Sequence, residues 1–274
     1  MRFMYASTIA LMLGGEPPTS QPDAVPSSQP TTAPTSQPED PNPAAPGFDA
    51  EHSDPRAIEL ADEVMTALGG RSAWDSTRYI AWDFVGARTL LWDKQEHRVR
   101  IDMGDNAGAS VVVVVDLATG DGRAWKNGSP MADEDGTTLV RRGIDIWRND
   151  SYWLVMPYKL KDDGVTLTYV GEDMTADQKQ ADVIALTYTG VGTTPDNKYH
   201  VYINRETKLV DQWDFYVNAD DAEPQLSTPW AGWKRHGDIM LCGDRGRMQL
   251  SDIGVYDTVP ETAFTNPMKV MLTR

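Results

Sequence analysis

The stretch Trp147-Arg-Asn-Asp-Ser-Tyr-Trp-Leu-Val-Met-Pro-Tyr-Lys-Leu160 decides the fold, because it is the densest aromatic and apolar run beyond the N-terminal segment. Upstream of it, apolar residues recur at about one helical turn, which predicts a helix over about 136–148. The turn formers Asn149-Asp150-Ser151 predict the end of that helix, and Pro157 predicts the end of a short apolar run over 152–156. We therefore expect a joint here, where a helix is docked onto a sheet.

Sequence typical of β-strands lies on both sides of this joint. Tyr79–Gly86 and His97–Met103 alternate apolar and polar residues, which predicts strands with one buried face and one face in water. Val111–Val115 is apolar throughout and predicts a central strand covered on both faces. The clearest hairpin joins 199–203 to 209–217. Further strands are expected at 89–93, 122–126, 165–170, 183–189, 230–236, 238–242 and 247–256.

An amphipathic helix is expected to begin at Asp54, with Pro55 at its first helical position and Gly69-Gly70 after its end. Its apolar stripe consists of Ile58, Ala61, Val64, Met65 and Leu68. Strands and helices do not alternate along the chain, so a parallel sheet is not expected. The sequence predicts an α+β fold with a single large curved antiparallel sheet, a half-barrel, and with helices on its concave face.

The N-terminal part of the chain is not typical of a globular domain. Residues 1–15 place one arginine before an apolar run, which has the size of a signal-peptide core and is too short for a membrane span. Residues 16–50 are rich in proline, serine and glutamine, and are expected to be a disordered tether. Residues 51–274 are the expected domain. We predict an exported protein of the periplasm or cell envelope that is not an integral membrane protein.

The chain of 274 residues has a formal net charge of -16. An acidic surface repels nucleic acids and anionic membranes because both are polyanions, so no nucleic-acid partner is expected. Cys242 is the single cysteine. One thiol forms neither an intramolecular disulfide nor a cysteine metal site.

Sequence motifs of catalysis and cofactor binding are missing. The glycines at 190 and 192 lack the third glycine and the helix of a dinucleotide fingerprint, and no Walker loop, Gly-x-Ser-x-Gly elbow or His-Glu-x-x-His motif occurs. The histidines are scattered, and the acidic turns Asp133–Asp135 and Asp220-Asp221 lack the spacing of a calcium loop. We expect a non-enzymatic protein with no catalytic residue, no cofactor and no metal. A hydrolase whose site is assembled from distant residues stays an alternative.

Aromatic side chains are the abundant feature, with nine tryptophans in the chain. Two interpretations fit them. They fill the core of a large sheet, or they border an apolar groove that a curved sheet leaves open. The candidates for lining such a cavity are Trp82, Phe84, Trp92, Trp153, Trp213 and Phe215.

Three runs carry a resemblance to a known family, namely Asn149–Leu160, Gly190–Lys198 and Val201–Val210. Together with the order of helices and strands over about 54–256, they resemble the bacterial lipoprotein-carrier and lipoprotein-sorting superfamily of LolA, LolB and RseB-like proteins, and most closely its uncharacterised envelope members. The resemblance implies a half-barrel capped by helices, with an apolar cavity for acyl chains.

Three functions stay open. The first is an exported, non-enzymatic binding or carrier protein that holds an acyl chain, a lipid or a lipoprotein in an apolar cavity. The second is a structural or sensory envelope module that has a filled core and binds another protein. The third is the hydrolase. A cavity on the order of several hundred Å³ under the helices distinguishes the first from the second.

Overall fold

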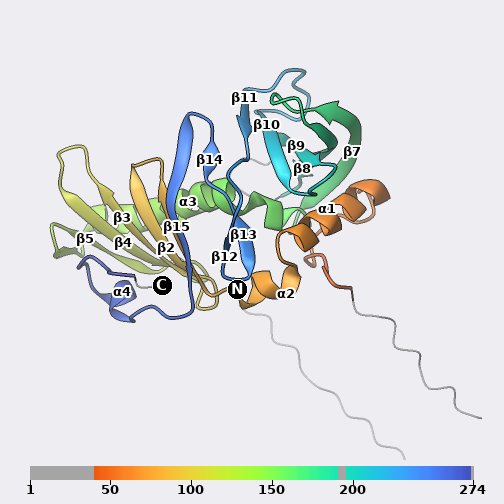
Figure 1. The fold of residues 1–274 in the computed structure, drawn as a ribbon. Helices are drawn as coiled ribbons and strands as arrows, with labels where there is room; N and C mark the ends of the chain where they lie inside the picture. The colour runs from red at the N-terminus through yellow and green to blue at the C-terminus, as the bar shows by residue number, and fades with distance from the viewer. Residues whose placement is uncertain (1–39, 191–195, 273–274) are drawn as a thin grey trace, which may run out of the picture. The chain divides into compact units, whose positions relative to one another are not determined.

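The structure is a computed structural model that describes residues 40–190 and 196–272. Figure 1 shows two antiparallel sheets joined by one long helix, α3 (Glu134–Val155). The prediction of an α+β fold with antiparallel strands is therefore confirmed. The expected signal peptide at 1–15 and the tether up to residue 39 lie outside the described residues. The compact unit begins at Asp40, before the boundary expected at residue 51.

The first sheet has eight strands in the order β14-β15-β1-β2-β3-β4-β5-β6. Its strands are β1 (Tyr79–Phe84), β2 (Arg88–Asp93), β3 (Arg98–Gly104), β4 (Ser110–Asp116), β5 (Gly122–Lys126), β6 (Ser129–Met131), β14 (Asp244–Arg245) and β15 (Met248–Tyr256). Strand β15 pairs with β1, so segments from the two ends of the domain lie side by side, next to the edge strand β14 of this sheet.

The second sheet has five strands in the order β11-β10-β9-β8-β7, and it contains the predicted hairpin as β9 and β10. Its strands are β7 (Val165–Met174), β8 (Gln180–Tyr188), β9 (Lys198–Asn204), β10 (Val210–Tyr216) and β11 (Leu226–Pro229). A separate hairpin pairs β12 (Lys234–His236) with β13 (Ile239–Leu241). The shorter helices are α2 (Arg71–Ser76), η1 (Met156–Lys159) and α4 (Thr262–Thr265). Within the described ranges, none of the helices combines the length and the apolar character that a membrane span needs.

The prediction of a single half-barrel is wrong. The strands divide between two main sheets, and in the described part of the chain neither sheet is closed or strongly curled. The physical reason is the length of α3, since its 22 residues span about 33 Å at a rise of about 1.5 Å per residue. A helix of this length carries the chain beyond the first sheet, so the five strands that follow it directly, β7 to β11, pair with one another, and only β14 and β15 return to the first sheet.

The predicted end of α3 at Asn149-Asp150-Ser151 is also wrong. The helix continues to Val155, so the apolar run expected at 152–156 forms its last turn and leads into η1. A distant contact holds the turn formers in the helix. Asp150 is fully buried, and its carboxylate accepts hydrogen bonds from Nε and Nη2 of Arg88 at 2.5 and 2.8 Å.

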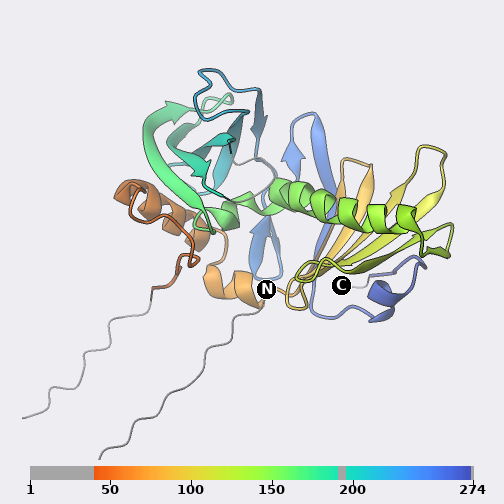
Figure 2. The same cartoon turned by 180° about the vertical axis from the view of Figure 1, so that it is seen from behind.

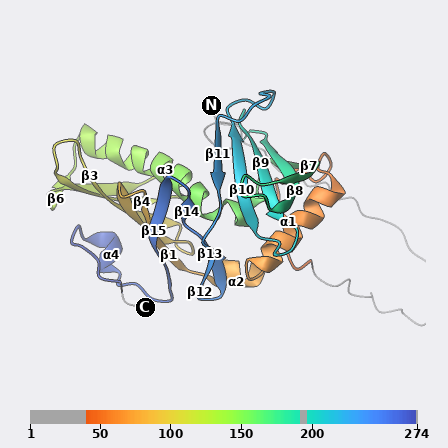
Figure 3. The ribbon, with the colours of Figure 1, turned by 45° about the horizontal axis from the view of Figure 1, so that its top comes forward.

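The first sheet is covered on both faces, by α3 on one side and by the segment around α4 on the other, as Figures 2 and 3 show. The prediction that 111–115 forms a central strand covered on both faces is confirmed by β4. Val113 and Val115 lie in the main core under α3, while Val112 and Val114 contact the cluster that contains Phe264 of α4.

One face of β3 was expected to be in water, and this prediction is wrong. Arg100 on that face is 1% exposed. Its Nη1 donates to the carbonyl oxygens of Ala263 and Asn266 at 2.9 and 2.7 Å, and its Nε donates to the Asp102 carboxylate at 2.7 Å. The C-terminal segment therefore covers polar residues whose alternation alone indicated a solvated face.

The predicted N-terminal helix is confirmed as α1 (Pro55–Ala67), and it ends before Gly69 as expected. Gly69 has a φ of +116°, and a Cβ there would lie 2.3 Å from the carbonyl oxygen of Asp238, so only glycine fits. Asp54 precedes the helix, but its carboxylate makes no cap and accepts instead from the backbone N–H of Tyr169 at 2.8 Å. Ile58, assigned to the buried stripe, is only half-buried and lies outside the main core.

Candidate functional site

Aromatic side chains gather between the end of α3 and the second sheet. We call this group the aromatic cluster. Its members are Tyr152, Trp153, Tyr188, Tyr199, Trp213, Phe215, Trp230 and Trp233.

Trp213 of β10 lies at the centre of the aromatic cluster and is 1% exposed. Its ring stacks on Tyr199 with 4.9 Å between centroids, and it meets Trp153 edge-on at 4.9 Å and Trp230 at 5.5 Å. Stacked and edge-to-face contacts at these separations are the arrangements that aromatic rings prefer. The rings therefore fill the space between the helix end and the sheet with contacts to one another.

Two hydroxyl groups inside the aromatic cluster bond to each other, those of Tyr152 and Tyr188. Burial raises the pKa of both phenols well above its usual value, and burial also raises the pKa of Tyr199. The three phenols are therefore neutral at physiological pH. Neutral phenols of this kind are poor general bases, so their arrangement favours packing and hydrogen bonding over acid–base chemistry.

Two indole groups of the aromatic cluster keep a free donor. Nε1 of Trp213 and Nε1 of Trp230 are buried, and neither has a hydrogen-bond partner among the described residues. By contrast, Nε1 of Trp233 donates to the carbonyl oxygen of Val210 at 2.9 Å. A buried donor without an acceptor costs about 1–3 kcal/mol.

A second group of rings lies near α2. Trp74 stacks on Tyr158 with 4.2 Å between centroids, and Trp92 meets Trp147 edge-on at 5.5 Å. The Nζ of Lys94 lies 3.5 Å from the centroid of the Trp74 ring, and burial lowers the pKa of Lys94 to about 7. The contact between Trp74 and Tyr158 holds η1 against α2.

The structure brings together three of the six residues predicted to line a cavity. Trp153, Trp213 and Phe215 all belong to the aromatic cluster. The other three are not members of it. Trp92 belongs to the second group of rings, and Trp82 and Phe84 lie on β1, in the same main core as Trp213. That these residues border a ligand cavity stays a prediction.

A groove of about 600 Å³ runs along the outer side of α1 and reaches the turn between β9 and β10. We call it the α1 groove. It is lined by Pro55, Ile58, Glu59, Asp62, Glu63, Thr66, Ala67, Thr207 and Lys208. It is a shallow hollow that is largely open to solvent, and none of the six predicted cavity residues lines it.

The α1 groove has an apolar floor and a charged rim. Its carboxylates lie three and four residues apart on one side of the helix, and each already meets one cation. Arg56 bonds to Glu59 at 2.6 Å, Lys161 to Asp62 at 2.6 Å, and Lys208 to Glu63 at 3.0 Å. Glu59 is 62% exposed, so a cation from outside the chain has access to its carboxylate.

The hydrolase alternative gains no support from two of the described histidines, His52 and His200. His52 pairs with Asp49 at 2.9 Å on the surface. His200 lies across the β9–β10 pair from Asp214, its Nδ1 is 3.2 Å from the hydroxyl of Tyr216, and burial lowers its pKa. In residues 40–190 and 196–272, neither of these histidines bonds to a serine, threonine or cysteine that would serve as nucleophile. The same ranges contain no group of three metal-ligating side chains.

Comparison with known proteins gives structural similarity at low sequence identity. No protein-family model matches the chain, and no curated protein matches it. A DUF1329 family protein from Desulfovibrio piger is 14% identical with a TM-score of 0.41, and the match covers 77% of this chain and 98% of that chain. MucB in complex with MucA(peri) is 13% identical with a TM-score of 0.22, and the match covers 79% of this chain and 62% of that chain. In the Pseudomonas aeruginosa MucA/MucB complex, the match is 14% identical with a TM-score of 0.20 and covers 78% of this chain and 64% of that chain.

The chain is therefore similar in structure, at low sequence identity, to a DUF1329 family protein and to MucB. The chain spans less than two thirds of the matched MucB chains. At these TM-scores the similarity defines neither a ligand nor an activity.

Sequence reasoning missed the α1 groove. Glu59, Asp62 and Glu63 look like the ordinary solvated side of a helix, and Ile58 falls into the apolar stripe by spacing alone. The second wall comes from Thr207 and Lys208, far along the chain, which only the folded structure brings to α1.

Proposed function

We propose that the protein is a non-enzymatic binding protein of the cell envelope, with a filled core and a binding surface for another protein. The observation that carries the proposal is the packing around Trp213, whose ring contacts Trp153, Tyr199 and Trp230 at 4.9 to 5.5 Å. An acyl chain in this place would have to separate these rings. A bound protein, by contrast, needs only a surface such as the α1 groove.

The charges of the described residues also favour binding over catalysis. The buried carboxylate of Asp93 is held by Arg78 and Arg98, and that of Asp150 by Arg88. Buried ions that are paired in this way hold elements of a fold together and are not poised for proton transfer. The proposed envelope location rests on the signal-like residues 1–15.

The experiment that tests this proposal is native mass spectrometry of the protein purified without detergent from the envelope of its own cells. The expected spectrum shows the chain without bound lipid. A lipid present in near-equal amount with the protein, released only on unfolding, would mean that the core holds a ligand and that the proposal is wrong.

A second candidate is the binding or transfer of an acyl chain, a lipid or a lipoprotein at the aromatic cluster. The specific observation in its favour is the pair of buried indole donors on Trp213 and Trp230 that have no acceptor among the described residues. An ester or carboxylate oxygen accepts from such donors, while the methylene chain gains about 0.8 kcal/mol for each buried CH₂. In the same mass spectrum, lipid retained by the wild-type chain and lost from Trp213→Phe would favour this candidate.

A further inference from the structure

The last described residues of the chain lie over an apolar face of the first sheet. The side chains of this face are all buried, and they are Tyr79, Ala81, Leu91, Val112, Val114 and Trp125. Residues 257–272 cover them with Phe264 of α4 and, further along, with Val270 and Leu272. We call residues 257–272 the C-terminal strap. No described residue of the strap belongs to the main core under α3.

Side chains attach the C-terminal strap to the sheet. Among the described residues, its backbone-to-backbone hydrogen bonds are local, and the widest of them joins the N–H of Asn266 to the carbonyl oxygen of Thr262. The outer side of the strap is in water, where Met268 and Met271 are 74% and 80% exposed. The strap can therefore leave this face without breaking a strand pair or opening the main core.

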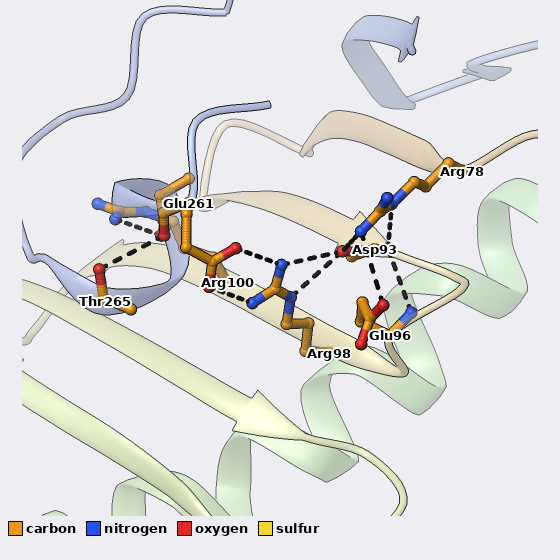
Figure 4. A network of polar contacts seen from close by, with 8 residues as sticks. Arg78, Asp93, Glu96, Arg98, Arg100, Glu261 and Thr265 are labelled. Atoms are coloured by element: carbon orange, nitrogen blue, oxygen red, sulfur yellow. Dashed lines mark hydrogen bonds and ion pairs between the residues drawn. The ribbon is translucent and has the colours of Figure 1, made fainter. Parts of the chain in front are cut away.

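Arg98 of β3 contacts two side chains of the C-terminal strap at once. Its Nη1 and Nη2 donate to the two carboxylate oxygens of Glu261 at 2.6 and 2.8 Å, and its Cζ lies 4.1 Å from the ring centroid of Phe264. Asp93 accepts from Nε and Nη2 of the same guanidinium and fixes its orientation, as Figure 4 shows. Paired bonds to a carboxylate and a cation over an aromatic ring both depend on geometry. This arginine therefore selects a carboxylate three positions before an aromatic ring.

Arg100, which lies on the same side of β3, binds the backbone of the C-terminal strap. Its Nη1 donates to the carbonyl oxygens of Ala263 and Asn266 at 2.9 and 2.7 Å, and its Nη2 donates to that of Met268 at 3.0 Å. Every residue has a backbone carbonyl, so these bonds hold a segment of this shape without regard to its sequence. Main-chain bonds that give affinity, next to side-chain contacts that give specificity, are typical of peptide-binding surfaces.

Release of the C-terminal strap leaves Arg98 short of one carboxylate. The buried carboxylate of Asp93 is shared between Arg78 and Arg98, at 3.1 and 3.2 Å. Glu96 lies 3.9 Å from Arg78 and so serves that arginine. Nη1 of Arg98 donates to Glu261 alone among the described residues. Because a guanidinium in this position attracts another carboxylate, the opened face favours an acidic partner.

We propose that the C-terminal strap is an internal ligand, and that the face beneath it binds a segment of a partner protein with a carboxylate three positions before an aromatic ring. The segment displaces the strap and takes over the contacts of Glu261 and Phe264. The strap is itself an example of such a segment, because it makes these contacts within one chain. This inference rests on the proposed function, since it names the surface and the chemistry of the protein partner.

Fluorescence anisotropy of a labelled synthetic peptide tests the inference on the full chain. The probe has the sequence of residues 257–272, and it is added to the wild type and to the strap variant Glu261→Gln/Phe264→Ala. In the wild type the strap competes at an effective concentration on the order of mM. The strap variant is therefore expected to bind the probe at least about tenfold more tightly than the wild type. Thermal unfolding shows that the variant is folded.

Two further changes identify the face and its chemistry. A probe that carries Glu261→Gln/Phe264→Ala is expected to bind the strap variant at least about tenfold more weakly than the unchanged probe. The unchanged probe is expected to lose as much when Arg98→Gln is added to the strap variant. Arg247→Gln, at an exposed position of the same sheet's β14–β15 turn, is the matched control and is expected to leave binding unchanged.

Three results would overturn the inference. The first is a folded strap variant that shows no saturable binding of the probe, or that binds the altered probe equally well. The second is a wild type that binds the probe as tightly as the strap variant, because the strap would then not occupy the site. The third is a wild type that forms dimers in sedimentation equilibrium while the strap variant does not, because the strap would then serve a second copy of the chain. None of these results affects the proposed function, which fails only if the core holds a lipid.

Discussion

Nη2 of Arg245 donates a hydrogen bond of 2.8 Å to the carbonyl oxygen of Trp153, and so connects β14 to the last turn of α3. Arg245 is 1% exposed, and the oxygens that accept from its guanidinium among the described residues are backbone carbonyls. Its charge is balanced by the carbonyl end of the helix and by the ring of Trp230, whose centroid is 3.6 Å away. This arginine ties the first sheet to the joint that the opening sequence stretch predicts.

Replacing this arginine is expected to weaken the whole domain. Arg245→Met leaves the carbonyl oxygens of Trp153 and Cys242 without their donor, so the free energy of unfolding should fall by about 3 kcal/mol. Urea denaturation measures the change. The exposed neighbour Arg247 provides the matched control, since Arg247→Met should alter stability by less than about 0.5 kcal/mol. Equal effects of the two substitutions would contradict the role given to Arg245.

The pair of Arg88 and Asp150 is expected to be a second strong contact. Asp150→Ala leaves a guanidinium that is only 22% exposed without its carboxylate, and the free energy of unfolding should fall by about 3 kcal/mol. Asp145→Ala is the control on the same helix, because Asp145 is 66% exposed and its loss should cost less than about 0.5 kcal/mol. The double variant Arg88→Met/Asp150→Leu should recover part of the loss in urea denaturation. No recovery would show that the pair does not act as a unit.

Replacing Gly143, in the middle of α3, by alanine is expected to destabilise the protein, although alanine has the higher helix propensity. In an exposed helix, replacing glycine by alanine gains about 1 kcal/mol. At Gly143 the new Cβ would lie 2.9 Å from Cγ2 of Val115 and 3.1 Å from Cγ1 of Val113, and such overpacking costs about 1–3 kcal/mol. Gly143→Ala should therefore lower the melting temperature, while Thr138→Ala on the exposed side of α3 should raise it slightly. A higher melting temperature for Gly143→Ala would mean that α3 does not lie as close to β4 as described.

The pH dependence of stability is expected to report the burial of Lys94. Burial lowers the Lys94 pKa from 10.5 to about 7 in the folded chain. Between these values the unfolded chain binds more protons than the folded chain, so the free energy of unfolding rises with pH, by up to about 1.4 kcal/mol per pH unit. Urea denaturation from about pH 7 to about pH 8.5 stays below the ordinary thiol pKa of 9.0, which burial raises to about 11 at Cys242. Lys94→Met should flatten the rise, and Lys234→Met, at an exposed position, should not. If the free energy of unfolding still rises with pH in Lys94→Met, another titrating group causes the rise.

Local patterns in the sequence predicted the elements that depend on local physics. The unbroken valines of β4 indicated a strand covered on both faces, and the alternation around Trp213 indicated the β9–β10 hairpin. Each of these patterns reflects the two-residue period of a strand. Neither pattern requires knowledge of which distant segment packs on the strand.

The predictions that failed depended on contacts between distant residues. Asp150 stays in a helix because Arg88, 62 positions away, satisfies its carboxylate. Arg100 is buried because a segment 163 to 168 positions later lies over it. Neither partner follows from spacing in the sequence. The half-barrel failed for the same reason, because strand pairing was inferred from strand order and the length of α3 was underestimated.

The central claim is that the core is filled and that binding occurs at the surface, and titration of the full chain with a fluorescent fatty acid tests it most directly. Tryptophan emission is followed as the ligand is added, because Trp213 and Trp153 lie in the aromatic cluster where an acyl chain would enter. The account predicts no saturable quenching. Saturable quenching at about one ligand per chain, lost in Trp213→Phe and unchanged by Thr66→Lys in the α1 groove, would contradict it.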